Sequence, residues 1–170
     1  MTLHYALPDL GTGRNPNWEA IGYPGPVSPP REATDELRIR RPEGAEMTIE
    51  ADVCVVGSGA GGGVIAGELA AGGKRVCVVE MGSYLNESDF HQLEIPAYQQ
   101  LYLNGGPFPT AEGQVTIQAG SALGGGTVVN WTNCLRPHAW VREEWARFGL
   151  EGLDGPDYDR HLDAVTERLG

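Results

Sequence analysis

Residues 51–80 read ADVCVVGSGAGGGVIAGELAAGGKRVCVVE, and this stretch decides the fold. The apolar run Val53–Val56 is short and β-branched, which is typical of a strand buried on both faces of a parallel sheet. Small and apolar residues follow at helical spacing until Gly72-Gly73, and a second apolar run then ends at Glu80. The order strand, glycine turn, helix, strand predicts a parallel β-α-β unit.

Glycines at positions 57, 59 and 62 give this unit the spacing of a dinucleotide-binding loop. Gly57 allows the tight turn, Gly59 lets backbone approach a pyrophosphate, and Gly62 lets the helix pack closely. Glu80 lies 18 residues after Gly62, where a carboxylate can bind ribose hydroxyls. The alternative is a β-α-β unit without a ligand. Several glycines at a helix start cost about 1 kcal/mol each relative to alanine, so a bound pyrophosphate is the favoured explanation.

A second glycine-rich loop occupies residues 120–137, GSALGGGTVVNWTNCLRP. Its run Gly124–Gly126 offers backbone N–H groups that no side chain blocks, so it can line a planar ring or an anion. The alternative is a flexible hinge, which the following Val128, Val129 and Trp131 disfavour.

Composition excludes several classes of function. The chain has 170 residues and a formal charge of −11, which disfavours nucleic acid or an anionic membrane as partner. Three cysteines without a CxxC pair indicate a reducing, cytoplasmic compartment, and Cys54 and Cys77 are expected to be apolar fillers of core strands. We expect no signal peptide, membrane segment or metal site, because no leader pattern, long apolar run or clustered histidines are found.

The flanking segments give weaker signals. Residues 1–35 predict an irregular arm anchored by Trp18, Ile21 and Tyr23, or else a disordered tail. The remaining expected elements are a short strand at 37–40, a helix from Ser88 or Asp89 to Leu103 kinked at Pro96, a strand at 115–119, a helix at 139–148, and a last helix from Asp157 or Asp159.

Together the two loops carry a family resemblance. The first resembles the FAD-binding fold of flavoprotein oxidoreductases, and the second resembles a signature of the glucose–methanol–choline (GMC) oxidoreductases. The run 119–150, AGSALGGGTVVNWTNCLRPHAWVREEWARFGL, is most similar to the long-chain alcohol oxidase and cholesterol-oxidase-like branch. The resemblance covers about residues 48–150.

The resemblance implies a set of FAD-binding residues. It places Gly57, Ser58, Gly59 and Gly62 at the pyrophosphate and Glu80 at the adenosine ribose. It places Gly120, Ser121, Gly125, Gly126, Thr127 and Asn130 near the pyrophosphate and the isoalloxazine. Asn130 stands where some members carry a histidine bound to the flavin, so non-covalent FAD is expected.

The resemblance also implies an activity. Family members oxidise a small-molecule alcohol, a late histidine takes the hydroxyl proton, and hydride passes to flavin N5. Nothing in this sequence resembles that late motif, so no catalytic residue is assigned and the chain alone is expected to be inactive. We expect an α/β fold with an incomplete sheet: an arm at 1–47, part of an FAD-binding domain at 48–150, and the start of a further segment at 151–170. A C-terminal domain or a partner chain would supply the rest.

Three alternatives stay open at this point. The first is a stand-alone, non-catalytic dinucleotide-binding module, and the second is an inactive fragment. The third is an NAD-dependent dehydrogenase, in which the GGGTVVN run would have no evident role.

Overall fold

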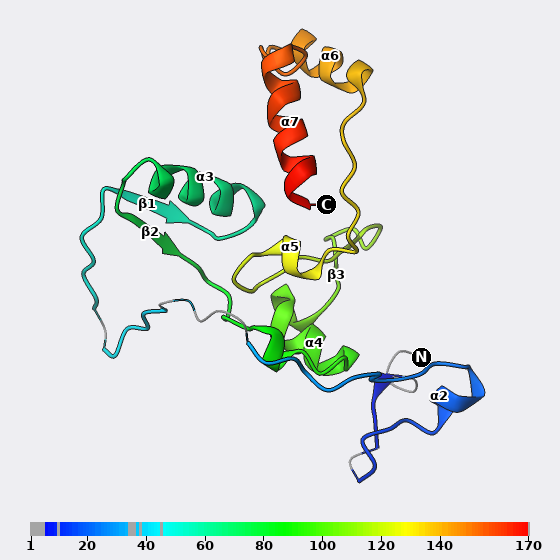
Figure 1. Ribbon diagram of the computed structural model, residues 1–170. Helices are drawn as coiled ribbons and strands as arrows, with labels where there is room; N and C mark the ends of the chain where they lie inside the picture. Colours follow the sequence, from blue (N-terminus) through cyan, green and yellow to red (C-terminus); the bar gives the residue numbers. More distant parts are fainter. Residues whose placement is uncertain (1–5, 10, 34–36, 38, 45, 170) are drawn as a thin grey trace. The chain divides into compact units, whose positions relative to one another are not determined.

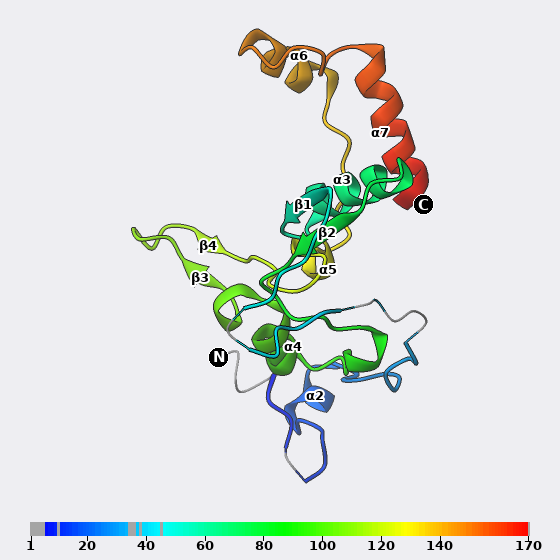
Figure 2. The same ribbon diagram turned by 90° about the vertical axis from the view of Figure 1, so that its left-hand side faces the viewer.

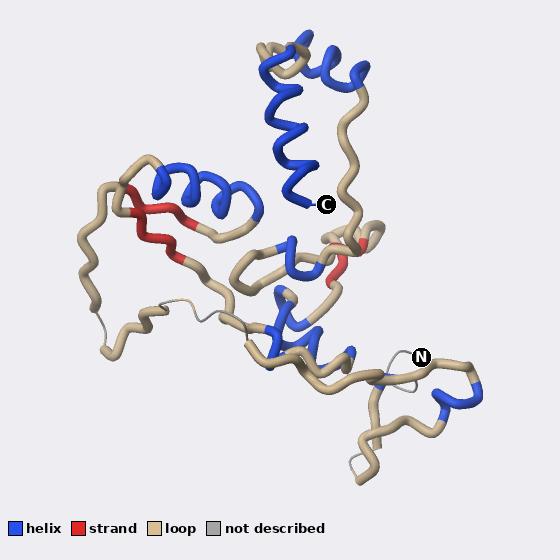
Figure 3. Tube along the Cα trace, in the orientation of Figure 1, coloured by secondary structure: helices blue, strands red, loops and turns tan. Residues whose placement is uncertain are grey.

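The computed structural model describes residues 6–9, 11–33, 37, 39–44 and 46–169. Its internal contacts divide the chain into two compact units, residues 1–130 and 131–170, which are described separately. In the first unit long loops join short helices and strands, and the described part of the second unit contains helices only (Figure 3). The domain boundaries expected from the sequence, after residues 47 and 150, stay predictions.

The β-α-β unit forms as the sequence predicts. Strand β1 (Val53–Val56) pairs in parallel with β2 (Val76–Val79), and the helix between them, α3 (Ala60–Ala71), packs against both strands (Figure 1). The C-cap of α3 is Gly72, whose N–H donates to Glu68 O at 3.0 Å. Gly73 follows with a φ of 81°, the left-handed conformation that ends many helices.

The expectation that these strands are buried on both faces is wrong. Val56 is 85% exposed, Cys54 is exposed and Cys77 is only half-buried, so the cysteines are not core fillers. The physical reason is the size of the sheet. Only two strands pair here in the described part of the chain, and the one helix between them covers a single face.

The predicted helix after β2 is two separate pieces. A 3₁₀ turn, η1 (Glu87–Asp89), is capped by Asn86, whose side chain accepts from the Ser88 N–H at 2.9 Å. Helix α4 begins only afterwards and spans Glu94–Leu101. Pro96 does not kink α4, because it lies in the first turn, where its missing N–H needs no partner within the helix.

A small hairpin leads from α4 to the second glycine loop. A 3₁₀ turn, η2 (Leu103–Gly105), ends the helical segment. Strands β3 (Phe108–Pro109) and β4 (Thr116–Ile117) then pair antiparallel (Figure 2), so the strand expected at 115–119 exists but is shorter. After the loop, the single turn α5 (Gly126–Val129) forms where no helix was predicted.

The N-terminal arm contacts the rest of the first unit beside one tryptophan. Trp18 lies in the short helix α2 (Asn17–Ala20), is 4% exposed, and meets Tyr23 edge-on at a ring distance of 5.5 Å. A shallow pocket beside it is lined by Ala6, Trp18, Ile21, Tyr23, Gln92, Leu93 and Glu94. Trp18 is therefore the anchor, whereas Ile21 is 56% exposed.

The short strand expected at residues 37–40 is not found. No strand forms at Leu37, Ile39 or Arg40, and residue 38 lies outside the described residues.

Gln92 holds the arm in place by side-chain hydrogen bonds, of which two are short. Its Oε1 accepts from Val27 N–H at 2.9 Å and its Nε2 donates to Ser28 Oγ at 2.8 Å. We expect Gln92→Ala to speed amide exchange at residues 27–28 about fivefold, because a hydrogen bond contributes about 1 kcal/mol. Hydrogen exchange read by mass spectrometry measures this effect, with Gln100→Ala on exposed α4 as the control. Unchanged exchange at 27–28 would contradict the prediction.

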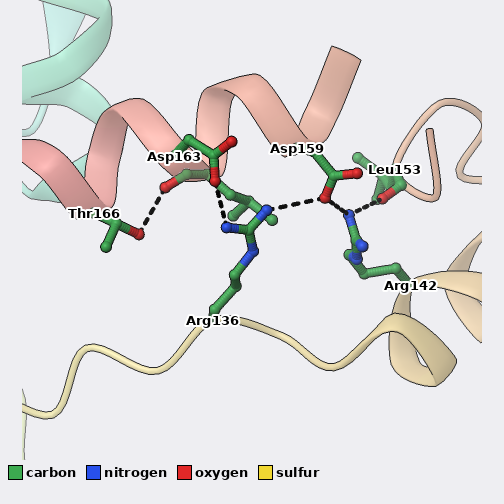
Figure 4. A network of polar contacts seen from close by, with 7 residues as sticks. Arg136, Arg142, Leu153, Asp159, Asp163 and Thr166 are labelled. Carbon is green, nitrogen blue, oxygen red and sulfur yellow. Dashed lines mark hydrogen bonds and ion pairs between the residues drawn. The ribbon is translucent and has the colours of Figure 1, made fainter. Parts of the chain in front are cut away.

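The second unit pairs two helices, α6 (Ala139–Arg147) and α7 (Pro156–Leu169). Pro156 is the first residue of α7, a position where its fixed φ is favourable, so the helix begins slightly earlier than predicted. Arg136 and Arg142 both reach Asp159 on α7, at 3.0 and 2.8 Å, and Arg136 also bonds Asp163 (Figure 4). Arg142 lies 6.0 Å from the centre of the Tyr158 ring.

Asp159 is the centre of this polar network. The hydrogen bonds from Arg136 and Arg142 hold the pKa of its carboxyl below the usual 3.8, so its contribution to stability is lost as pH falls below that value. Asp159 forms an ion pair with Arg142, whose side chain is only 11% exposed. Asp163 pairs only with Arg136 in the described residues, and its own side chain is 67% exposed. We expect Asp159→Asn to lower the Tm about twice as much as Asp163→Asn, because exposed ion pairs contribute little. Equal decreases in thermal melts of the two variants would contradict this.

Candidate cofactor site

The first glycine turn leaves β1 tightly and opens α3. Gly57 has a φ of 88°, and its N–H donates to Val79 O at 2.8 Å, which ties the turn to the end of β2. A side chain at Gly62 would overlap the carbonyl oxygen of Gly57, so α3 can lie this close only with glycine there. By contrast, a Cβ at Gly59 would meet no atom within 4 Å.

The N-terminus of α3 presents unpaired backbone donors. Its N-cap is Gly59, no side chain caps it, and its first turn carries no acidic residue. The first N–H groups of a helix lack partners within the helix, and the helix dipole places partial positive charge there. This end of a 12-residue helix is therefore suited to an anion such as a phosphate.

Glu80 joins the turn to the end of β2. Its Oε2 accepts from the Ser58 backbone N–H at 2.8 Å and from the Ser58 hydroxyl at 2.6 Å. Its Oε1 accepts from Gly82 N–H at 2.7 Å. These bonds, that from the Ser58 hydroxyl first, hold the pKa of the Glu80 carboxyl below its usual 4.5. The carboxylate therefore stays ionised near neutral pH and has strong contacts within the protein itself.

The second glycine loop lies directly against the first. The N–H of Gly124 donates to Ser58 Oγ at 2.9 Å. Gly125 has a φ of 59°, and a Cβ there would lie 3.0 Å from Gly59 Cα, so the two loops touch through bare backbone. Ala122, 1% exposed, forms a parallel bridge with Ser83 just after β2. Segments 66 residues apart in sequence are thus joined at Ser58.

Glycines also allow the second loop to fold on itself and onto Gly82. A Cβ at Gly82 would overlap the backbone of Ser121, and one at Gly120 would overlap the backbone of Gly125. The N–H of Ser121 donates to Leu101 O at 2.7 Å, which fixes the loop to the end of α4. Residues 120–125 of the loop are therefore held by backbone contacts, unlike a free hinge. The boundary between the two units falls later in the loop, after residue 130, and these contacts do not test a hinge there.

The remaining predicted residues lie in α5 and just after it. Gly126 begins α5, and a Cβ there would meet no atom within 4 Å. The Thr127 hydroxyl donates to Gly124 O at 2.5 Å. Asn130 follows α5 as its C-cap and is exposed. The structure thus brings Ser58 and Gly59 against the second loop and bonds Glu80 to Ser58, whereas the Thr127 hydroxyl bonds within its own loop.

Comparison with known proteins gives this arrangement a family. Residues 98–170, which include the second loop, match the model of the GMC oxidoreductase family. The chain is 35% identical to a long-chain-alcohol oxidase of Arabidopsis thaliana, FAO3, over 93% of its own length. The chain belongs to the GMC oxidoreductase family.

Other members of the GMC oxidoreductase family match shorter stretches. The chain is 39% identical to the Arabidopsis long-chain-alcohol oxidase FAO4B over 79% of its length. It is 37% identical, again over 79%, to an uncharacterized GMC-type oxidoreductase of Mycobacterium tuberculosis. The matched regions make up 25%, 18% and 22% of the three relatives, so the chain spans a quarter of their length or less. No solved structure matches the chain.

Sequence inspection of this GMC oxidoreductase chain missed two contacts, that of Gly82 with the backbone of Ser121 and that of Ala122 with Ser83. Gly82 and Ala122 each touch a neighbouring backbone segment, and their small size was the available signal. Two other findings bear on the site. The described residues hold no group of three metal-ligating side chains, and no helix among them is long and apolar enough to cross a bilayer.

Proposed function

We propose that the chain is the FAD-binding portion of a flavin-dependent oxidoreductase that acts on the CH–OH group of alcohols. The observation that carries this proposal is the contact between the two glycine loops through Ser58, beside the uncapped N-terminus of α3. Family membership gives the reaction class. The β1-α3-β2 unit is, in this proposal, the start of a Rossmann-like FAD-binding fold.

The residues present fit FAD in two respects. Gly57, Gly59 and Gly61 leave open space where a side chain would otherwise stand, beside backbone N–H groups that no side chain caps. Glu80 is ionised and partly accessible, as a ligand of ribose hydroxyls must be. We propose non-covalent binding, with Glu80 at the ribose and the two loops at the pyrophosphate and flavin.

Within this proposal the chain binds and orients the cofactor. Bound FAD would supply the acceptor for the hydride that leaves the alcohol carbon. No residue here is assigned the transfer of the hydroxyl proton, so we propose that the binding function, not turnover, belongs to this chain. The cytoplasmic location is proposed from the cysteine pattern alone.

The substrate class follows from the relatives. Three matched Arabidopsis proteins are named long-chain-alcohol oxidases, and we propose a long-chain aliphatic or sterol-like alcohol for this protein. Enzyme expressed from the whole gene should oxidise such alcohols faster than sugars or choline. Turnover of sugars or choline with none of aliphatic or steroid alcohols would overturn this substrate class.

A binding titration tests the cofactor. The purified chain is titrated with FAD while flavin fluorescence is followed, with NAD as competitor and circular dichroism to verify folding. We expect saturable FAD binding by a folded chain that NAD does not displace. A folded chain that binds no FAD, or that prefers NAD, would overturn the proposal.

A further inference from the structure

We infer that Ser58 is a positioning residue, which fixes the second glycine loop against the first, and that it is not a direct ligand of the pyrophosphate. The effect on FAD rests on the function proposed above, whereas the effect on the loop does not. The resemblance to the family placed Ser58 at the pyrophosphate, so the inference assigns this residue a different role.

The first argument is the direction of the hydrogen bonds. A serine hydroxyl has a single proton to donate. That proton is on the 2.6 Å bond to Glu80 Oε2, because an ionised carboxylate can only accept. Ser58 Oγ therefore presents only lone pairs to any other group, and phosphate oxygens would repel them.

The second argument is that a lone pair of the Ser58 hydroxyl and the Ser58 backbone N–H are also engaged by the protein. Its Oγ accepts the Gly124 N–H at 2.9 Å, and its own backbone N–H donates to Glu80 at 2.8 Å. Ser58 is half-buried, which strengthens such bonds relative to an exposed site. Every hydrogen bond that the structure gives Ser58 thus joins two parts of the protein.

The third argument is that the two loops otherwise meet here through glycine backbone. Around Ser58 the two loops meet through bare backbone, since Gly125 lies against Gly59 and Gly82 lies against Ser121. Backbone contacts between glycines bury little apolar surface and so contribute little to fixing a loop. The Ser58 hydroxyl therefore supplies the side-chain hydrogen bond that holds Gly124 beside the start of α3.

Two readouts on the full chain test the inference. The first is hydrogen exchange of residues 120–130 without FAD, and the second is the Kd for FAD. We compare Ser58→Ala, Ser58→Thr, which keeps the hydroxyl, and Ser83→Ala, a control residue that contacts the loop through its backbone carbonyl. We expect Ser58→Ala to raise exchange about tenfold and to weaken FAD binding about tenfold, in line with the loss of a half-buried hydrogen bond. Ser58→Thr and Ser83→Ala should stay within about twofold of the wild type.

The outcomes separate this inference from the proposed function. Weaker FAD binding with unchanged exchange would overturn the inference, because Ser58 would then act on the ligand directly. Unchanged exchange and binding would overturn it too. If the wild type binds no FAD but Ser58→Ala still loosens residues 120–130, the proposed function fails and the positioning role stands. Should Ser58→Ala not fold, Glu80→Gln tests the same junction, and it must raise exchange over 120–130 for the inference to hold.

Discussion

Replacing Gly62 by valine should abolish saturable FAD binding and lower the free energy of unfolding by about 3 kcal/mol. The new side chain would overlap the carbonyl oxygen of Gly57, and that backbone cannot move freely because the Gly57 N–H is bonded to Val79. Helix α3 would have to move away from the turn at Gly57 that precedes it. Flavin titration and equilibrium denaturation of the variant measure the two effects.

The control for this variant is Gly67→Ala in the same helix. Gly67 is exposed, and a Cβ there would meet no atom within 4 Å. Alanine favours a helix interior over glycine by about 1 kcal/mol, so this variant should be unchanged or slightly more stable. Gly62→Val with wild-type stability and FAD affinity would contradict the close packing described at this turn.

Replacing Glu80 by alanine should lower the free energy of unfolding by about 2–4 kcal/mol. The substitution leaves the N–H groups of Ser58 and Gly82 without their acceptor, and the hydroxyl of Ser58 without its partner. Each polar group left unsatisfied costs about 1–3 kcal/mol where it is removed from water. Chemical denaturation measures the loss, and Glu68→Ala, at an exposed position of α3, should change stability by less than about 0.5 kcal/mol.

The contribution of Glu80 should also depend on pH. Because its pKa is below 4.5 in the folded chain, the folded state favours the ionised form. The stabilisation is therefore complete above 4.5 and is lost as pH falls through the folded pKa. The stability difference between wild type and Glu80→Gln should shrink in that acid range. A constant difference from neutral pH down to pH 3 would show that the charge of Glu80 has no such role.

The β-α-β unit could be predicted from the sequence because the residues that specify each of its elements lie within or beside that element. Strand β1, helix α3 and strand β2 each follow from periodicity and from glycines within a few residues. The same rules misplaced the helix after β2. They took Ser88 or Asp89 as a cap of a long helix, whereas Asn86 caps a single 3₁₀ turn and α4 begins at Glu94. Several polar residues in that segment can cap a helix, and only tertiary contacts choose among them.

The contact between the two glycine loops could not be predicted from such local rules. The glycine spacing indicated which backbone segments are candidates for binding a ligand, but the Ser58–Gly124 bond spans 66 residues. No local pattern specifies a contact at that separation. The strands' burial was mispredicted for a related reason. An apolar run such as Val53–Val56 indicates what a strand can pack against, and it does not indicate how many strands and helices surround it.

The glycines of the two loops fall into two kinds, with a consequence for experiments on such proteins. At Gly62, Gly82 and Gly120 neighbouring backbone fills the place of a side chain, so the fold itself requires glycine. At Gly59 that place is open, and its φ of −59° is one that alanine adopts readily. Under the function proposed above, a methyl group at Gly59 would stand where the pyrophosphate approaches, while the polypeptide folds as before. Alanine at this position should therefore give a folded protein that does not bind FAD, which is the reference for every flavin-dependent measurement on the chain.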